Sequence, residues 1–262
     1  MTAVASRALD TAALEDKVKT MYRAVALEPE GDFHFEMGRA LAERLGYDPR
    51  ALDAIPQDAI RSFAGVGHYF DLAGLRPGEA VVDLGSGSGM DSFLAARATG
   101  GSGRVIGIDM TKEQLAKASR LADEGRFANV EFRQGYIDRT GLDSGCCDLV
   151  ISNGVVNLAP DKAAVFREAA RLLRPGGRLA LADIVTEVQL PEGITCDATL
   201  WAACIGGAMQ LDAYVAAIEA AGLRVVQQRD NPQYRFLSNN ATKAAGKYGV
   251  KSVSLAAVKP GT

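Results

Sequence analysis

From residue 80 onward, apolar runs of strand length alternate with segments in which apolar residues recur at helical spacing. Strands are predicted over residues 80–85, 103–110, 129–135, 147–153 and 175–185, the last beginning with a Pro-Gly-Gly turn. Helices are predicted over residues 90–99, 111–125 and 161–174, with Thr111 as the N-cap of the second. Repeated strand–helix units of this length are typical of a parallel sheet with helices on both faces.

Two regions depart from this alternation. Residues 1–75 are rich in helix formers, so we expect a helical N-terminal cap, with helices at 11–26, 36–45 and 56–74, ahead of a sheet domain at 76–262. Residues 186–210 interrupt the rhythm with a tryptophan, two cysteines and a Gly-Gly, and are expected to form a cap insertion. A helix at 211–223 and strands at 224–229 and 250–260 are predicted to follow.

Composition narrows the class of protein. The chain has 262 residues, of which 48% are hydrophobic and 23% charged, the balance of an ordinary enzyme with a large core. A net charge of -3 provides no basic field for a phosphate backbone, so nucleic acid is not an expected partner. The sequence shows no secretory signal, membrane span, disulfide framework or zinc spacing. We therefore expect a cytoplasmic enzyme without a metal site, whose oligomeric state stays open.

The stretch VVDLGSGSGMD, residues 81–91, joins a predicted strand to a predicted helix through alternating glycines. Gly85, Gly87 and Gly89 let the backbone lie close to a ligand, and the helix start presents free N–H groups. Asp109 ends the next strand twenty residues beyond Gly89, where a carboxylate can accept hydrogen bonds from ribose hydroxyls. The pair of features favours a nucleoside ligand over a purely structural turn.

The glycine spacing separates two classes of nucleoside cofactor. Dinucleotide sites use G-x-G-x-x-G, whereas this loop has G-x-G-x-G with Met90 at the sixth position. Asp83, two residues before the first glycine, would repel a pyrophosphate but can accept hydrogen bonds from an ammonium group. S-adenosylmethionine has an amino-acid tail, a sulfonium and a ribose, so it fits this loop better than NAD.

Five motifs in order carry a family resemblance: VVDLGSGSGMD, GIDM, GYID, ISNGVVNLAPDK and LLRPGGRLALADI. With them the chain resembles class I S-adenosylmethionine-dependent methyltransferases. The stretches GIDMTKEQL, SNGVVNLAPDK and LWAACIGGAM make it similar to the arsenite methyltransferase group over roughly residues 18–258. The resemblance implies a Rossmann-like α/β fold with a mostly parallel seven-stranded sheet, S-adenosyl-L-methionine as cofactor with S-adenosyl-L-homocysteine as product, and a small-molecule acceptor.

The resemblance also implies a role for each matching residue. Asp109 would hold the ribose hydroxyls, and Asn153 would lie beside the sulfonium. Tyr22 matches an N-terminal tyrosine that closes over the cofactor, with helix packing as its alternative role. The methionine moiety would be surrounded by Asp83, Gly85, Ser86, Gly87 and Gly89, and the adenine by Met110, Ile137 and Asp138.

The cysteines depart from the pattern of the group. Arsenite methyltransferases bind trivalent arsenic through thiolates, which suit a soft centre. Of the three cysteine positions that the resemblance implies, Ser92 and Gly154 hold two, and only Cys204 remains. Cys196 lies eight residues earlier, close to two helical turns, so a two-thiol site with Cys204 is an alternative. The other cysteines, at 146 and 147, are expected to pack as small hydrophobic residues.

The acceptor side gives fewer signals. His68 is a candidate base at the cap mouth, with a structural hydrogen-bonding role as the alternative; Tyr22, Tyr69 and Asp138 are weaker candidates. Gly154 leaves space that suits an organic acceptor bulkier than arsenite. The leading hypothesis is methyl transfer to a non-arsenic small molecule. The alternatives are methylation of arsenite or methylarsenite with fewer thiols, and a catalytically silent cofactor-binding protein.

We expect the purified protein to bind S-adenosylmethionine and S-adenosylhomocysteine, and to bind NAD(H) far more weakly, because of the glycine spacing and the two acids. Titration calorimetry with each ligand measures the affinities directly. Equal or tighter binding of NAD(H) would contradict this interpretation of the loop.

Overall fold

A computed structural model describes residues 9–195, 201, 205–237 and 239–261 of the chain. Its centre is an eight-stranded sheet in the order β3-β2-β1-β4-β5-β8-β7, with β6 paired to β5. β8 runs antiparallel to β5 and β7, and the other pairs are parallel. The strands are β1 (Ala80–Leu84), β2 (Arg104–Asp109), β3 (Val130–Gln134), β4 (Cys147–Asn153), β5 (Leu173–Thr186), β6 (Met209–Gln210), β7 (Arg224–Asp230) and β8 (Lys251–Val258).

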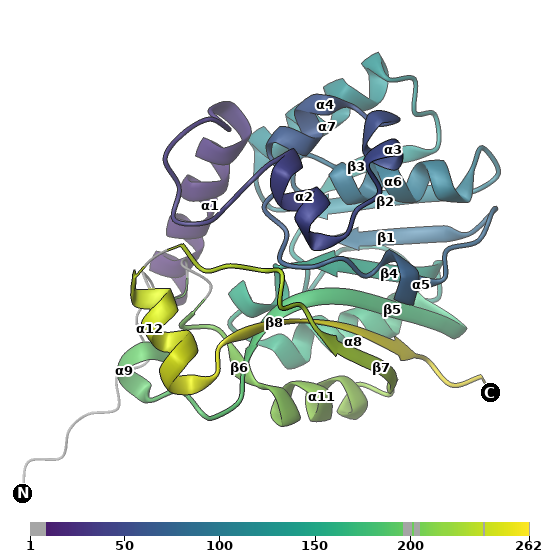
Figure 1. Cartoon of the computed structure of the whole chain (residues 1–262). Coiled ribbons are helices and arrows are strands. Elements are labelled where there is room, and N and C mark those ends of the chain that lie inside the picture. Colours follow the sequence, from purple (N-terminus) through teal and green to yellow (C-terminus); the bar gives the residue numbers. More distant parts are fainter. Residues whose placement is uncertain (1–8, 196–200, 202–204, 238, 262) are drawn as a thin grey trace, which may run out of the picture.

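The predicted α/β architecture is confirmed: seven strands form the continuous path, and the two-residue β6 is an addition to it. Figure 1 shows the helices arranged around this sheet. They are α1 (Thr11–Leu27), α2 (Arg39–Leu45), α3 (Pro49–Asp53), α4 (Gln57–Arg61), α5 (Phe70–Ala73), α6 (Met90–Thr99), α7 (Lys112–Glu124), the 3-10 turn η1 (Val156–Leu158), α8 (Lys162–Leu172), α9 (Glu192–Thr195), α11 (Leu211–Ala220) and α12 (Asn239–Tyr248).

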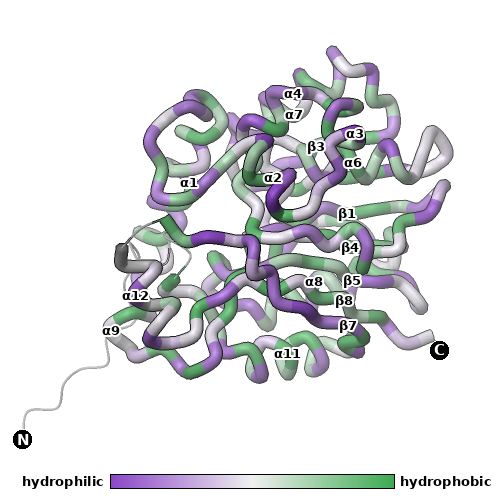
Figure 2. The backbone as a smooth tube through the Cα atoms, viewed as in Figure 1, coloured by the Kyte–Doolittle hydropathy of each residue, from purple (hydrophilic) through white to green (hydrophobic). Residues whose placement is uncertain are grey.

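Side chains along the strands alternate between the two faces of the sheet. Val81 and Leu149 belong to a cluster with buried residues of α6 and α5. Val82 and Val150 belong to a second cluster, which includes buried residues of α8 and α11. Central strands buried on both faces are continuously apolar, whereas the edge strand β7 is almost wholly exposed and hydrophilic (Figure 2).

The N-terminal helices share their core with the sheet region. Leu41 and Phe63 pack in one cluster with Phe93 and Leu121, which come from α6 and α7. Figure 1 shows α1 beyond the carboxyl ends of the central strands. The helices ahead of β1 are therefore built onto the sheet region and do not form a core of their own.

The predicted helix over residues 56–74 is wrong in its middle. The structure has only the short helices α4 and α5 there, and residues 62–69 between them are not helical. A Cβ on Gly65 would lie 2.3 Å from Phe63 and 2.7 Å from the Asn153 amide nitrogen, so this segment lies closely against β4. Tertiary contact overrides the helical composition at this point.

The region predicted as a cap insertion is described in part. β5 extends through Thr186, which the prediction assigned to the insertion. Trp201 and Ile205 are buried in the same cluster as Ile184 of β5. The unpredicted helix α12 contributes Tyr248 to this cluster. No helix among the described residues is long and apolar enough to cross a membrane.

Candidate active site

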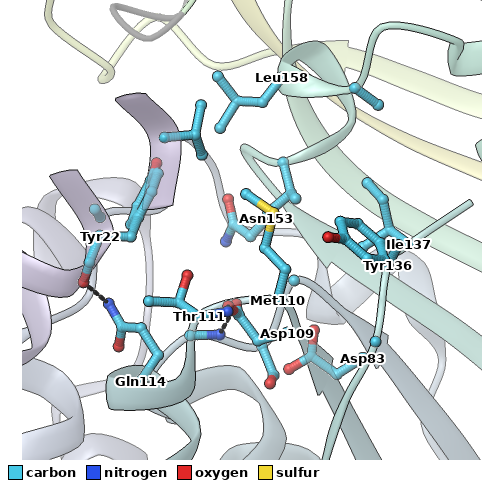
Figure 3. A pocket seen from close by; sticks show the side chains of 18 of the residues that line it. Tyr22, Asp83, Asp109, Met110, Thr111, Gln114, Tyr136, Ile137, Asn153 and Leu158 are labelled. Atoms are coloured by element: carbon cyan, nitrogen blue, oxygen red, sulfur yellow. Dashed lines mark hydrogen bonds between the residues drawn. The ribbon is translucent and has the colours of Figure 1, made fainter. Parts of the chain in front are cut away.

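A cavity of about 420 Å³ opens at the carboxyl ends of β1, β2 and β4 (Figure 3). β1 has β2 on one side and β4 on the other, so this is the point where the strand order reverses. Ligands of open α/β sheets bind at such a reversal. Of the predicted site residues, the cavity lining includes Tyr22, Asp83, Gly85, Ser86, Gly87, Asp109, Met110, Ile137, Asp138 and Asn153.

The glycine turn is shaped mainly by contacts with the protein itself. Gly85 has a φ of +79°, and a Cβ on it would lie 2.4 Å from Val155. Gly89 has a φ of +93°, and its Cβ would lie 2.7 Å from Phe132, so the structure places it behind the cavity wall and not in it. Ser86 does line the cavity, and its buried hydroxyl has no hydrogen-bond partner among the described residues. A buried polar group normally has a partner, so a polar ligand atom fits here.

Asp109 is held by the backbone around it. Its carboxylate accepts hydrogen bonds from the N–H of Gly87 at 3.0 Å and from the N–H of Thr111 at 2.8 Å. Burial raises the pKa of Asp109, and the backbone donors oppose that shift. Each carboxylate oxygen has further acceptor capacity, so the geometry leaves Asp109 able to receive vicinal hydroxyls.

Asp83 lies deeper, with only 3% of its surface exposed. The Ser92 hydroxyl donates to its carboxylate at 2.6 Å. Burial raises the pKa of Asp83 to about 8, and the nearby charge of Asp91 contributes in the same direction. A cationic group that enters the cavity beside Asp83 would favour the ionised form.

Asp91 is a site residue that the sequence interpretation missed. The carboxylate is buried and lines the cavity. It accepts hydrogen bonds from the hydroxyls of Tyr47 and Tyr69, each at 2.8 Å, and from the side-chain amide of Asn153 at 3.0 Å. Burial raises the pKa of Asp91 against these three donors. Its place two residues after Gly89, the last glycine of the loop, was the available signal.

Asn153 links the end of β4 to the segment ahead of α5. Its side-chain oxygen accepts hydrogen bonds from the N–H of Val66 at 2.8 Å and of Gly67 at 3.4 Å. Its amide donates to the Gly67 carbonyl as well as to Asp91, both at 3.0 Å. The side chain therefore fixes the non-helical segment at the cavity edge, in addition to lining the cavity.

Helix α1 forms the roof of the cavity. The Gln114 side chain, two residues into α7, donates to the backbone carbonyl of Tyr22 at 2.9 Å (Figure 3). The Tyr136 hydroxyl, from the GYID stretch, donates to the Glu15 carboxylate at 2.7 Å. Thr111 occupies the predicted N-cap position of α7, but its side chain makes no capping bond. At the start of α7, the side chain of Gln114 therefore holds α1 in place, and both Gln114 and Thr111 line the cavity.

The wall beyond Asn153 is apolar and rests on a buried polar cluster. Asp183 is fully buried and accepts hydrogen bonds, each at 2.7 Å, from the side chains of Asn157 and Tyr214. Lys162 donates to the carbonyl of Ala159, a cavity-lining residue, at 3.0 Å. Burial raises the pKa of Asp183 to about 6 and lowers that of Lys162 to about 8. This cluster fixes the position of the η1 wall.

His68 is not among the lining residues, which argues against its predicted role as a base. Its imidazole packs edge-on against Tyr47 with ring centroids 4.7 Å apart, and its Nδ1 is 3.4 Å from Asp71. Burial lowers the pKa of His68. Tyr69, a weaker candidate, is fully buried and donates to Asp91, so its structural role is the one observed.

The structure describes two of the four cysteines. Cys196 and Cys204 lie outside the described residues. Cys147 is buried, as predicted, and donates to a backbone carbonyl, but Cys146 is exposed, contrary to its predicted packing. Among the described residues, no cluster of three His, Cys, Asp or Glu side chains is arranged to hold a metal ion.

Ser92 and Gly154 do not face a common space. Ser92 is fully buried against Asp83 and is not in the cavity lining. A Cβ on Gly154 would lie 3.1 Å from Val66, and the residue has a φ of +71°. Gly154 is not in the cavity lining either, and Val66 lies where a side chain at this position would start. The prediction that Gly154 leaves space for a bulky acceptor is therefore wrong.

Comparison with known proteins agrees with this geometry. The methyltransferase domain family matches residues 75–236. An arsenite methyltransferase of Halobacterium salinarum is 39% identical over 221 residues, or 84% of this chain and 56% of that protein. The crystal structure of an arsenic(III) S-adenosylmethionine methyltransferase from Chlamydomonas reinhardtii matches with a TM-score of 0.64 at 30% identity, covering 86% of this chain and 74% of that one. Geranyl diphosphate C-methyltransferase from Streptomyces coelicolor shares the fold, with a TM-score of 0.69 at 19% identity, over 94% of this chain and 97% of that one.

The chain therefore belongs to the class I S-adenosylmethionine-dependent methyltransferases. Within that class it is similar to the arsenite methyltransferase group. It spans between 37% and 56% of the length of the arsenite methyltransferases that it matches in sequence. The cavity fits the cofactor of this class, since it offers the buried acids Asp83 and Asp91, the backbone-anchored Asp109, and a serine hydroxyl at the glycine turn that has no hydrogen-bond partner among the described residues.

Replacing Asp109 with asparagine should weaken binding of S-adenosylhomocysteine by about 1.5–3 kcal/mol, or roughly tenfold to a hundredfold. The change removes the charge that would accept from ribose hydroxyls and keeps the size of the side chain. Calorimetry on Asp109→Asn is compared with Asp123→Asn, which removes an exposed acid outside the cavity lining. Equal affinity in the two variants would remove Asp109 from the site.

A second prediction concerns pH. The pKa of Asp83 is about 8 in the folded chain and near its ordinary 3.8 when unfolded, so the folded chain keeps a proton that the unfolded chain releases. The stability from this difference is fully present below about pH 4 and is lost as the pH rises to about 8. Asp83→Asn cannot ionise, so its melting temperature without cofactor should fall less between about pH 5 and pH 8 than that of the wild type. Parallel melting curves would contradict the assignment.

Proposed function

We propose that this chain transfers the methyl group of S-adenosylmethionine to a small-molecule acceptor other than arsenite. The observation that carries the proposal is the cavity at the strand-order reversal. It is lined by Asp83, Asp91, Asp109 and Ser86, and the Ser86 hydroxyl has no hydrogen-bond partner among the described residues. Acids at this site complement a cofactor with an ammonium and a sulfonium group. The cofactor supplies a methyl group already activated on sulfur.

The lining residues divide into zones that match the parts of this cofactor. Asp109 would receive the ribose hydroxyls, with its orientation fixed by two backbone donors. Met110, Ile137 and Asp138 would border the adenine, because they follow the ends of β2 and β3. The ammonium would lie by Asp83 and Asp91, at the buried floor.

The protein contributes alignment and exclusion of water. Methyl transfer requires the acceptor atom, the methyl carbon and the sulfur to lie in line, and held geometry of this kind lowers a barrier strongly. Asn153, fixed by the backbone of Val66 and Gly67, would border the sulfur, and Tyr22 on α1 would close the cavity from above. We also propose that residues 1–75 and 186–210 act as the cap over this cavity.

Two observations favour an acceptor other than arsenite. The Ser92 hydroxyl donates a hydrogen bond to Asp83, and the residue does not line the cavity. Gly154 is not in the cavity lining, and a Cβ on it would lie 3.1 Å from the apolar side chain of Val66. Neither position offers the soft ligand that trivalent arsenic prefers. The second candidate function, methylation of arsenite or methylarsenite through Cys204 and Cys196, is favoured by the similarity to arsenite methyltransferases.

Cys204→Ser separates the two functions. With labelled cofactor and a panel of arsenite, methylarsenite, thiols, quinones and phenols, we expect label in an organic acceptor. We also expect that Cys204→Ser changes its turnover little, by about 1 kcal/mol in the barrier, as for other near-isosteric changes. Binding of S-adenosylhomocysteine to the variant serves as the control for folding. Strong arsenite methylation by the wild type that is abolished in Cys204→Ser would establish the second function instead.

A further inference from the structure

The charge of the cavity lining is one-sided. The described lining residues carry no Lys, Arg or His side chain, and five of them carry a carboxyl group. The acids are Glu15, Asp83, Asp91, Asp109 and Asp138.

Three lysines approach this lining from outside it. Lys19 forms an ion pair with Glu15, one of the acids in the lining. Lys117 donates from behind the wall to the Ser62 hydroxyl at 2.8 Å, and Lys162 donates to the Ala159 carbonyl at 3.0 Å. Each ammonium is engaged by a protein oxygen, so the described lining presents anionic side chains without a cation for an anionic ligand.

The end of the cavity away from Asp109 has a different character. The side chains there come from α1, from the segment before α5 and from the turn after β4. Eight of them are hydrocarbon, and those of Leu14, Val18, Phe63 and Leu158 are also largely buried: the set is Leu14, Val18, Phe63, Ala64, Val155, Leu158, Ala159 and Pro160. These eight side chains cannot neutralise a charge or take a proton, whereas the same segments also contribute the polar lining residues Thr11, Glu15, Tyr22 and Ser62.

We propose that the methyl acceptor is an uncharged, apolar molecule, and that acceptors bearing a phosphate or carboxylate are excluded. The inference rests on the proposed function and names its substrate class. An anion in the cavity would be repelled by the carboxylates of Asp91 and Asp109. At an effective dielectric constant near 20 and a separation of roughly 10 Å, one such repulsion lowers affinity about tenfold. An uncharged apolar molecule instead gains from burial against the hydrocarbon wall.

The reaction balances with an uncharged acceptor. A lone pair on the acceptor atom forms the bond to the methyl carbon while the carbon–sulfur bond breaks and its electron pair stays on sulfur. The positive charge passes to the acceptor, which loses a proton to water if its nucleophilic atom carried one. The acids of the cavity stabilise the positive charge on the methylated acceptor, whereas they would destabilise an anionic acceptor.

Matched pairs of molecules test the acceptor class. 4-Methylbenzyl mercaptan is compared with 4-carboxybenzyl mercaptan, and 4-ethylphenol with 3-(4-hydroxyphenyl)propanoate; each pair shares its nucleophile and differs in charge. Calorimetry on protein saturated with S-adenosylhomocysteine gives each Kd, and labelled cofactor gives methyl transfer. In at least one pair, we expect the Kd of the uncharged member to be lower than that of the anionic member by a factor of about ten or more. Equal or tighter binding of the anionic members, or no binding of either uncharged member, overturns the proposal.

A charge variant links the discrimination to the cavity. Ala12 is an exposed residue of α1 that lines the cavity, whereas Thr20 is an exposed residue of the same helix that does not. Ala12→Lys should reduce the ratio of the Kd values of the anionic and neutral members by a factor of about three or more. Thr20→Lys should leave this ratio unchanged. Equal effects of the two variants overturn the proposal. Failure of S-adenosylhomocysteine to bind would contradict the proposed function itself, which distinguishes the two failures.

Discussion

Two carboxyl groups buried at the floor of one cavity, those of Asp83 and Asp91, are the constraint on which the site depends. A buried carboxylate is costly unless donors surround it. Ser92 supplies a donor to Asp83, while Tyr47 and Tyr69 supply donors to Asp91. These donors come from α6 and from the region before β1, so satisfying two acids fixes the position of the N-terminal segments against the sheet.

The same requirement gives a role to the residues at two positions where the resemblance to arsenite methyltransferases implies cysteines. A thiol at position 92 would be a weaker donor to Asp83 than the Ser92 hydroxyl, which sits 2.6 Å from it. Gly154 and Val66 meet at the point where Asn153 ties the chain before α5 to β4. Ser92 therefore makes a hydrogen bond, and Gly154 an apolar contact, that help to hold the structure around the cavity.

Charge and polarity divide the cavity into two halves that fit one reaction. The acidic half, with Asp109 and the floor acids, complements a cofactor that carries positive charge. The hydrocarbon half, which rests on the buried Asp183 cluster through Asn157 and Lys162, would shield an acceptor from water, and its hydrocarbon side chains offer no base. Such a site favours nucleophiles that need alignment more than deprotonation.

The sequence by itself determined the order of strands and helices from β1 to β5, because period-2 and period-3.6 patterns and the glycine turn are local properties of the chain. It also identified Asp83 and Asp109, whose positions at strand ends follow from that order. It misjudged residues 62–69, it left open a catalytic or a structural role for His68, and it missed Asp91 with its partners. Tyr47 and Asn153 lie 44 and 62 residues from Asp91 along the chain. Only the tertiary structure decides such contacts, since no local pattern records which distant donors will satisfy a buried charge.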